Sequence, residues 1–261
     1  MAQSSISLPP LPRVALTPRR WFTFAAHTYK ATAYQHHREL VPALNRLIGK
    51  DAVVFDVGAH SGQFATLFAR LASNGVVYSF EPGRYARMIL TFSLALNRAS
   101  NVRVFPIALG DKAGPSSIRM PIKRSGSFGF GLANLGTRDE GRQHVSEPID
   151  VATLDGLVGA MGVTQVDFVK ADIEGWEMRM LVGGRAMLER FHPTLWLEMV
   201  DSHLARAGDS IAALWAFLTG LGYQPLTAHP DGNFTPIDQP AQGDIVWVTA
   251  ERARALTTRA A

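Results

Sequence analysis

The sequence contains no cysteine among its 261 residues, which excludes disulfides, iron–sulfur clusters, thiolate zinc sites and cysteine nucleophiles. No apolar run approaches the roughly 20 residues that a membrane-spanning helix needs. The N-terminal segment MAQSSISLPPLPRVAL also lacks the charged start and apolar stretch of a secretory signal. These absences lead us to expect a cytoplasmic protein, and an apolar content of 47% is enough for a globular core.

Signatures of three common enzyme classes are missing as well. The sequence has no GxSxG elbow of a serine hydrolase and no GxxxxGK[ST] loop of a nucleotide triphosphatase. A dinucleotide-binding fingerprint would need glycine at positions 58, 60 and 63, but His60 and Gln63 occupy the last two. NAD binding is therefore disfavoured.

Acidic residues are scarce near the N-terminus. Residues 1–50 hold seven basic residues and one acidic residue, Glu39, while the rest of the chain is slightly acidic. This arm is either a solvated leader or a segment that touches an anionic membrane, glycan or nucleic acid. A nucleic-acid enzyme should carry basic residues across its body, so we expect no nucleic-acid partner and keep a peripheral membrane contact of the arm as an alternative.

Strand-like and helix-like segments alternate from residue 51 onward. This βαβ alternation predicts an α/β fold with a mostly parallel sheet and helices on both faces. The expected strands are 52–57, 76–80, 102–107, 166–171, 194–199 and 245–249. The expected helices are 63–72, 85–97, 176–190 and 210–218.

The same patterns divide the chain into segments. We expect a loose proline-rich leader over 1–20, an amphipathic helical cap over 21–50, one main domain over 51–250 and a tail over 251–261. Residues 110–150 break the strand–helix rhythm and include SGSFGFGLANLG at 125–136. So many glycines predict either an active-site lid or a merely flexible insertion.

The sharpest local motif is VVFDVGAHSG, in which a buried strand runs into Gly58 and Gly62 before a helix. Glycine permits a tight turn and lets a ligand approach the backbone closely. Glu81 ends the next strand, where an acid can accept hydrogen bonds from both hydroxyls of a ribose. The ordered pair suits a nucleoside without phosphates joined to an amino acid, which describes S-adenosylmethionine. His60 either binds this ligand or only supports the turn.

Longer blocks around these motifs resemble the FkbM family of S-adenosylmethionine-dependent methyltransferases. The blocks are FDVGAHSG, SFEPGR, NVRVFPIALGDKAG, IDVATLDGL, VDFVKADIEGWEMRMLVGG and LWLEMV. The resemblance implies a Rossmann-like, seven-stranded class I methyltransferase sheet and O-methylation of a hydroxyl, often on a sugar or polyketide-type product. The cofactor-binding candidates are the residues of the glycine loop, the ribose acid and two residues expected beside adenine: Asp56, Gly58, Ala59, His60, Gly62, Glu81, Ala108 and Leu109.

Three acids form the catalytic candidates. Asp172 and Glu174 follow the strand at 166–171, and Glu198 lies near the end of the next strand. Carboxyl ends of strands line the ligand crevice of an open α/β sheet, and a carboxylate there can orient or deprotonate a hydroxyl. We expect Asp172 to take this role first and Glu198 next. Alternatively, Asp172 and Glu174 only stabilise the start of the helix at 176–190 through its dipole.

The sequence leaves the acceptor open. A hydroxyl of a glycan, lipid-linked sugar or secondary metabolite is our first expectation. A catalytically inactive S-adenosylmethionine-binding scaffold and an RNA methyltransferase are the alternatives. Asp172, Glu198 and His203 could in principle hold a metal, but no tight ligand spacing supports one, and we expect none.

Overall fold

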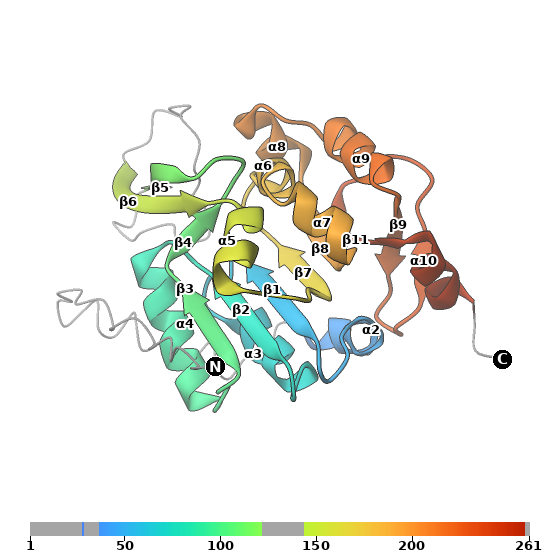
Figure 1. The fold of residues 1–261 in the computed structure, drawn as a ribbon, viewed down its shortest axis with the longest axis horizontal. Coiled ribbons are helices and arrows are strands. Elements are labelled where there is room, and N and C mark those ends of the chain that lie inside the picture. The colour runs from blue at the N-terminus through green and yellow to red at the C-terminus, as the bar shows by residue number, and fades with distance from the viewer. Residues whose placement is uncertain (1–27, 29–36, 122–143, 259–261) are drawn as a thin grey trace.

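The computed structural model describes residue 28 and residues 37–121 and 144–258 (Figure 1). The leader 1–20, most of the expected cap over 21–50 and the glycine-rich segment 125–136 lie outside these residues. The expectations about the basic arm and the lid therefore stay predictions.

An eight-stranded sheet forms the centre of the described part of the chain, with the order β10-β9-β11-β8-β7-β1-β2-β3. Strands β1, β2, β3, β7 and β8 are parallel to one another, whereas β11 runs antiparallel to both β8 and β9. The strands are β1 (Val53–Val57), β2 (Val76–Phe80), β3 (Val102–Phe105), β7 (Phe168–Ala171), β8 (Thr194–Met199), β9 (Tyr223–Ala228), β10 (Phe234–Pro236) and β11 (Gly243–Thr249).

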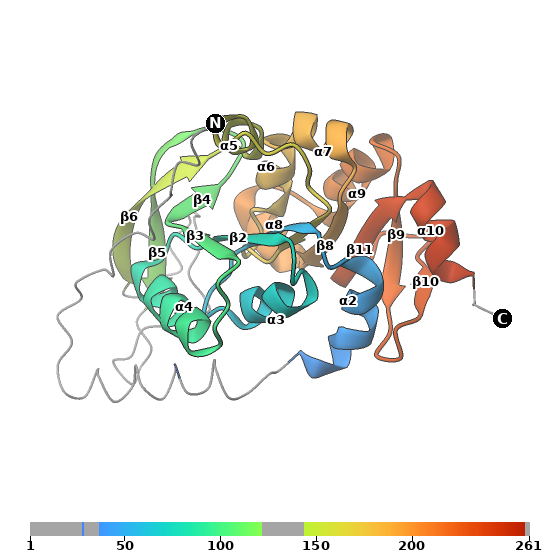
Figure 2. The same ribbon diagram turned by 60° about the horizontal axis from the view of Figure 1, so that its bottom comes forward.

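Helices cover both faces of this sheet, as Figure 2 shows. One face packs against α2 (Val41–Leu47), α3 (Gln63–Leu71), α4 (Arg84–Leu96) and α10 (Ala250–Thr257). The other packs against α5 (Leu154–Met161), α6 (Glu177–Val182), α7 (Arg185–Phe191), α8 (Asp201–Ala207) and α9 (Ile211–Gly220). A 3-10 turn, η1 (Arg38–Leu40), precedes α2. Because both faces are covered, the central strands are apolar on both sides.

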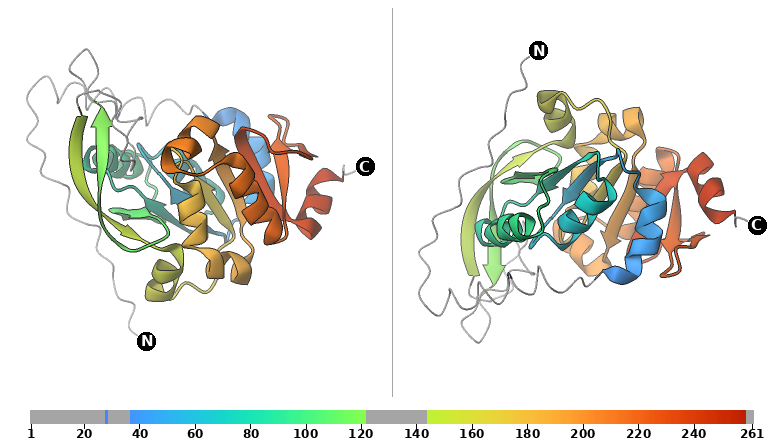
Figure 3. Two further views of the ribbon diagram at one scale, coloured as in Figure 1. Left: turned by 90° about the horizontal axis from the view of Figure 1, so that it is seen from above. Right: turned by 90° about the horizontal axis from the view of Figure 1, so that it is seen from below.

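A second, three-stranded sheet has the order β4-β6-β5 and consists of β4 (Ile107–Leu109), β5 (Gly114–Pro121) and β6 (His144–Ala152). Figure 3 shows it at the opposite end of the molecule from α10. Strands β5 and β6 lie in the region 110–150, where the sequence predicted only an insertion. This sheet brings Ile118 toward the carboxyl ends of the central strands.

The Rossmann-like α/β fold expected from the sequence is confirmed, with differences in detail. The main sheet has eight described strands rather than seven, because β10 pairs with β9 and adds a short edge strand. The strand expected over 102–107 is wrong in part: the chain divides at Pro106, which has no N–H for a ladder, and β4 then joins the second sheet.

Two further expectations are corrected at helices. The single helix expected over 176–190 is two helices, α6 and α7, separated by Gly183 and Gly184. A side chain at Gly183 would collide with the backbone carbonyl oxygen of Gly110, so the chain needs a glycine at this crossing. The tail expected over 251–261 is instead mostly α10, which buries Ala253 and Leu256 in the core.

Two arginines tie α2 to the C-terminal part of the sheet. Arg46 donates to the carbonyl oxygens of Gly232 at 2.9 Å and Leu256 at 3.0 Å. In the reverse direction, Arg252 of α10 donates to the carbonyl oxygen of Leu47 at 2.6 Å. The described residues contain no helix long and apolar enough to cross a membrane.

Candidate functional site

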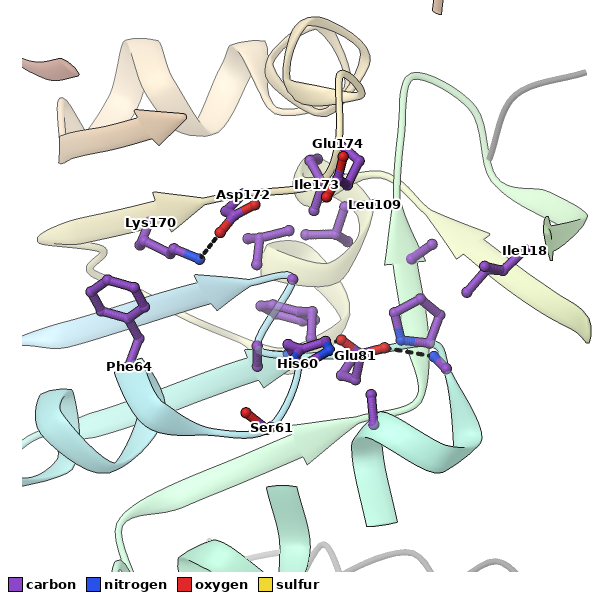
Figure 4. Close-up of a pocket in the computed structure, with 18 of the residues that line it drawn as sticks. His60, Ser61, Phe64, Glu81, Leu109, Ile118, Lys170, Asp172, Ile173 and Glu174 are labelled. Atoms are coloured by element: carbon purple, nitrogen blue, oxygen red, sulfur yellow. Dashed lines mark hydrogen bonds and ion pairs between the residues drawn. The ribbon is translucent and has the colours of Figure 1, made fainter. Parts of the chain in front are cut away.

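A pocket of about 330 Å³ lies at the carboxyl ends of β1, β2 and β7 and is closed on one side by the second sheet. Figure 4 shows Phe64 and Lys170 at one end, Ile118 toward the other, and His60 and Glu81 between them. The carboxyl ends of these three strands meet here because the strands are parallel. Open α/β sheets bind their ligands at this edge.

The loop after β1 requires its glycines. Gly58 has a φ of +76° and Gly62 a φ of +87°, values that favour glycine strongly. A side chain at Gly58 would run into the backbone carbonyl oxygen of Asp172, and one at Gly62 would lie 2.5 Å from Leu90 Cδ1. Glycine at both positions therefore lets the loop pack closely against the Asp172 backbone and against α4, and Gly58 itself lines the pocket.

His60 adopts a left-handed backbone with a φ of +47° between these glycines. That conformation directs its backbone N–H to Oε2 of Glu81 at 2.9 Å, while the residue also lines the pocket. Non-glycine residues in this region carry backbone strain and concentrate at functional sites. His60 therefore positions the Glu81 carboxylate through its backbone, and its ring remains a candidate ligand contact.

Glu81 is held firmly at the end of β2. Its second oxygen, Oε1, accepts from the backbone N–H of Gly83 at 2.8 Å. Arg87 fixes the same turn by donating to the carbonyl oxygens of Glu81 at 3.0 Å and Pro82 at 2.7 Å. Burial raises the pKa of Glu81 to about 7, and the two backbone amides oppose that shift. Each oxygen keeps a lone pair for a hydroxyl donor, as ribose binding requires.

The end of the pocket near β4 is apolar. Ala108 and Leu109, the residues expected beside adenine, line it together with Ile107. Ile118 of β5 completes this wall from the second sheet, and sequence analysis did not single it out. The enclosure suits a flat aromatic base, because such pockets are predominantly apolar with few polar groups.

Asp56 lies beneath the glycine loop and is fully buried rather than on the pocket wall. Neither carboxylate oxygen has a hydrogen-bond partner within the described residues. Burial raises its pKa to about 6, while the nearby Lys170 ammonium lowers it. A buried polar group without a hydrogen-bond partner costs free energy of folding. The Asp56 carboxyl therefore has either a structural role or a role in ligand binding.

Lys170 is a pocket residue that sequence analysis missed. It lies in β7, is only 4% exposed, and its Nζ lies 3.2 Å from Oδ2 of Asp172. Burial opposes ionisation of Asp172, but the charge and hydrogen bond of Lys170, with smaller contributions from Glu198 and His60, together hold the pKa of the Asp172 carboxyl below its ordinary value. Asp172 is thus an ionised hydrogen-bond acceptor and a weak base, which changes the role we expected for it.

The register of the sheet places three carboxylates in a line. Lys170 pairs with Trp196 across β7 and β8, and side chains two residues further on return to the same face. Asp172 and Glu198 follow those two residues, and Asp244 of β11 pairs with Glu198. We call Asp172, Glu198 and Asp244 the carboxylate row.

Glu198 is the member of this row best suited to accept a proton. Burial, together with the nearby charges of Asp172 and Glu174, raises its pKa to about 7. Its side chain hydrogen-bonds Asp172. A general base works best when its pKa lies near the working pH, so Glu198 meets that requirement and Asp172 does not. Glu198 stands beside the pocket rather than among the residues that line it.

Glu174 is placed by a strained turn. It has a φ of +57°, and Gly175 follows with a φ of +101°. A side chain at Gly175 would collide with the carbonyl oxygen of His203, so the turn packs directly on α8. Oε2 of Glu174 then lies 3.2 Å from Nδ1 of His203 and 3.7 Å from the Arg206 guanidinium. Glu174 faces the pocket and these partners at once.

Glu177 has a different task. It is buried, and its Oε1 accepts from the backbone N–H of Ile173 at 2.9 Å. This bond closes the turn that carries Asp172 and Glu174.

The described residues contain no group of three histidine, aspartate or glutamate side chains arranged to hold a metal ion.

The structure therefore brings together most of the residues singled out from the sequence. The cofactor-binding candidates that line the pocket are Gly58, Ala59, His60, Glu81, Ala108 and Leu109, and two catalytic candidates, Asp172 and Glu174, join them. The others lie just outside its wall: Asp56, Gly62 and Glu198. Sequence analysis missed His37, Phe64, Lys170 and Asp244. Of these, only Lys170 carried a local signal, because it is a lone charge in an apolar strand.

Known proteins resemble this chain over much of its length. The chain is 29% identical over 161 residues to the AMB antimetabolite synthetase AmbE of Pseudomonas aeruginosa, covering 51% of this chain and 8% of that protein. It is 24% identical over 164 residues to the 2-O-methyltransferase NoeI of Sinorhizobium fredii, covering 59% of this chain and 65% of NoeI. The matches thus span less than two thirds of either relative.

A solved structure of the methyltransferase FkbM from Methylobacillus flagellatus aligns with a TM-score of 0.49 and 21% identity, covering 77% of this chain and 44% of that one. The model of the Methyltransferase FkbM domain family matches residues 56–225. That match begins at Asp56, includes the turn that carries Asp172 and Glu174, and ends in β9. The chain belongs to the FkbM family of S-adenosylmethionine-dependent methyltransferases.

Proposed function

We propose that the protein transfers a methyl group from S-adenosylmethionine to a hydroxyl of a glycan, a lipid-linked sugar or a secondary metabolite. The observation that carries this proposal is the position of Asp172 and Glu198 beside the Lys170 end of the pocket. Two carboxylates of different basicity meet there, one to orient a hydroxyl and one to accept its proton.

The fit of the cofactor rests on the pocket itself. Gly58 lines the pocket at the turn after β1, Glu81 offers lone pairs for the ribose, and Leu109 and Ile118 enclose an apolar space. S-adenosylmethionine supplies a methyl group on a positively charged sulfur. The protein must chiefly align the acceptor oxygen with that methyl group and keep water away.

In this arrangement Glu198 accepts the proton of the acceptor hydroxyl, and Asp172 holds the hydroxyl in place. Glu198 is about half ionised near pH 7, so it is available as a base at neutral pH. Asp172 remains ionised because Lys170 keeps its pKa low. General-base assistance of this kind contributes roughly 10²–10⁴-fold in rate.

The relative named 2-O-methyltransferase supports oxygen as the acceptor atom, and the one named an antimetabolite synthetase supports a small product. A row of carboxylates would repel the phosphates of RNA. A neutral polyol meets no such repulsion. No observation favours the RNA methyltransferase or the inactive scaffold.

The test is incubation with methyl-labelled S-adenosylmethionine and a fractionated cell extract, separated into polysaccharide, lipid, small-molecule and RNA fractions. We expect label in a hydroxyl-bearing fraction other than RNA, as an alkali-stable ether. Glu198→Gln is the matched control because it keeps the shape of the side chain and removes its basicity. Label that enters RNA, or that enters no fraction, would refute the proposal.

A further inference from the structure

Lys170 occupies a buried position, where a charged side chain loses hydration free energy. It lies third in β7, whose other residues, Phe168, Val169 and Ala171, are fully buried and apolar. Lysine is almost never buried unless it is paired, because an ammonium loses its hydration when it leaves water. A residue that carries such a cost has either a structural or a functional reason to be there.

Three groups surround the Lys170 ammonium. Asp172 binds it at 3.2 Å, and Asp56 is its register partner on β1, with its side chain on the same face. The ammonium also lies 4.8 Å from the centre of the Phe64 ring, within the range of a cation–π contact. Burial alone would lower the pKa of Lys170, but Asp172 and Asp56 more than compensate and raise it above its ordinary value.

Charge neutralisation explains part of this arrangement, because the ammonium balances the buried Asp56. It does not explain why Lys170 also lines the pocket. An ammonium has three N–H donors, and the single hydrogen bond that the Lys170 ammonium makes within the described residues goes to Asp172. Donors therefore remain for a ligand beside Asp172, where the acceptor hydroxyl is expected.

We propose that Lys170 is a catalytic residue whose ammonium donates a hydrogen bond to the acceptor oxygen and stabilises the negative charge that develops there. This inference rests on the proposed O-methylation. In the step, the O–H bond of the acceptor breaks and its proton passes to Glu198. A bond forms between that oxygen and the methyl carbon while the carbon–sulfur bond breaks, and the sulfur keeps the bonding pair. Lys170 stays protonated throughout.

The positive charge of Lys170 is compatible with a positively charged sulfur nearby only because its surroundings are acidic. Asp56 lies on one side of Lys170 and Asp172 on the other, so the local charge is negative before any ligand binds. Lys170 thus acts on the oxygen without excluding the cation. Removal of one positioned donor to a developing oxyanion typically costs about 10²–10³-fold in kcat.

The experiment compares Lys170→Met, which removes the charge at similar volume, with Lys170→Arg, which keeps it. Lys112→Met serves as control because Lys112 is exposed. Turnover is measured with labelled S-adenosylmethionine and the extract fraction that takes label from wild type. S-adenosylhomocysteine affinity is measured by calorimetry. We expect Lys170→Met to lower kcat about 100-fold or more, Lys170→Arg to restore part of that loss, and the affinity of both to stay within a few-fold of wild type.

A second measurement does not depend on turnover or on a folded variant. The chain has only five lysines, so the Cε signal of each can be followed by NMR in ¹³C-lysine-labelled wild-type protein. With S-adenosylhomocysteine present, addition of the extract fraction that takes label from wild type should shift the Lys170 signal and leave that of Lys112 in place.

The outcomes separate the two proposals. Wild-type protein that labels no hydroxyl refutes the proposed function. Wild-type protein that does, together with Lys170→Met at normal turnover or a Lys170 signal unmoved by acceptor, refutes the role of Lys170 alone. Loss of S-adenosylhomocysteine affinity in step with turnover would also refute it, because the lysine would then serve the cofactor pocket rather than the acceptor.

Discussion

Replacement of Glu81 by glutamine tests the cofactor half of the site without any knowledge of the acceptor. Glutamine keeps the size of the side chain but turns one acceptor oxygen into an NH₂ donor. In the wild type, both oxygens already accept from backbone amides, those of His60 and Gly83. The new NH₂ must therefore face one of these N–H groups, and the ribose loses an ionised acceptor.

The expected magnitude follows from these contacts. A hydrogen bond to a charged group is worth about 1.5–3 kcal/mol, which corresponds to a roughly 10- to 150-fold loss of S-adenosylhomocysteine affinity. Wild-type affinity should also depend on pH. Ribose hydroxyls bind the ionised carboxylate best, and the pKa of Glu81 is about 7 in the free protein. Affinity should therefore rise from pH 5 to pH 8 in wild type and lose this dependence in Glu81→Gln.

Isothermal titration calorimetry with S-adenosylhomocysteine at several pH values measures both effects. Glu147→Gln is the matched control. Glu147 also accepts from a backbone N–H, that of Arg84 at the start of α4, but it does not line the pocket. Its affinity should equal that of wild type. If Glu81→Gln binds as tightly as wild type at pH 8, with the same pH dependence, Glu81 does not hold the ribose.

Three more predictions follow from the geometry. Glu198→Gln should slow methyl transfer by about 10²–10⁴-fold and abolish the rate increase near pH 7, as measured by initial rates with labelled cofactor; an unchanged pH profile would place the base elsewhere. Gly58→Ala should destabilise the protein by about 1–3 kcal/mol in urea unfolding, because its φ is +76° and the new methyl meets a carbonyl. Gly159→Ala, in an open position of α5, should instead stabilise it by about 0.5–1 kcal/mol; equal effects would contradict the close packing at Gly58. Burial raises the pKa of four carboxyls, those of Asp56, Glu81, Glu177 and Glu198. The free energy of unfolding should therefore fall as pH rises from about 4.5 to about 7, because the folded state holds more protons on these groups than the unfolded state. A rise over this range in urea titrations would contradict their burial.

The central strands were predictable because their signals are local. Strands β2 and β8 have the bounds expected from their apolar runs, and β1 differs by one residue at its start. The end of β3 was predicted less well because the effect of Pro106, which has no N–H for a ladder, was not taken into account. The division between α6 and α7 was missed because Gly183 packs against the distant backbone of Gly110. The second sheet was missed for the same reason, since β5 and β6 are paired mainly with each other and carry many polar residues.

The candidate site divides in the same way. Glu81, Asp172 and Glu198 stand out in the sequence as acids after apolar strands. Asp244 does not, because only the register between β11 and β8 brings it beside Glu198. The shift in basicity from Asp172 to Glu198 was also out of reach, since it depends on the 3.2 Å contact with Lys170 and on how deeply each carboxyl is packed.

The hydrogen bonds by which Arg46 of α2 and Arg252 of α10 join these two helices have a consequence for synthesis on the ribosome. Arg46 reaches Leu256, 210 residues further along the chain, so α2 cannot complete its packing until α10 has left the exit tunnel. At translation rates of about 5–20 residues per second, this delay lasts roughly 10–40 s. During that interval the apolar face of α2, with Ala43, Leu44 and Leu47, stays uncovered by its C-terminal neighbours. The nascent chain should therefore be a chaperone client until α10 emerges.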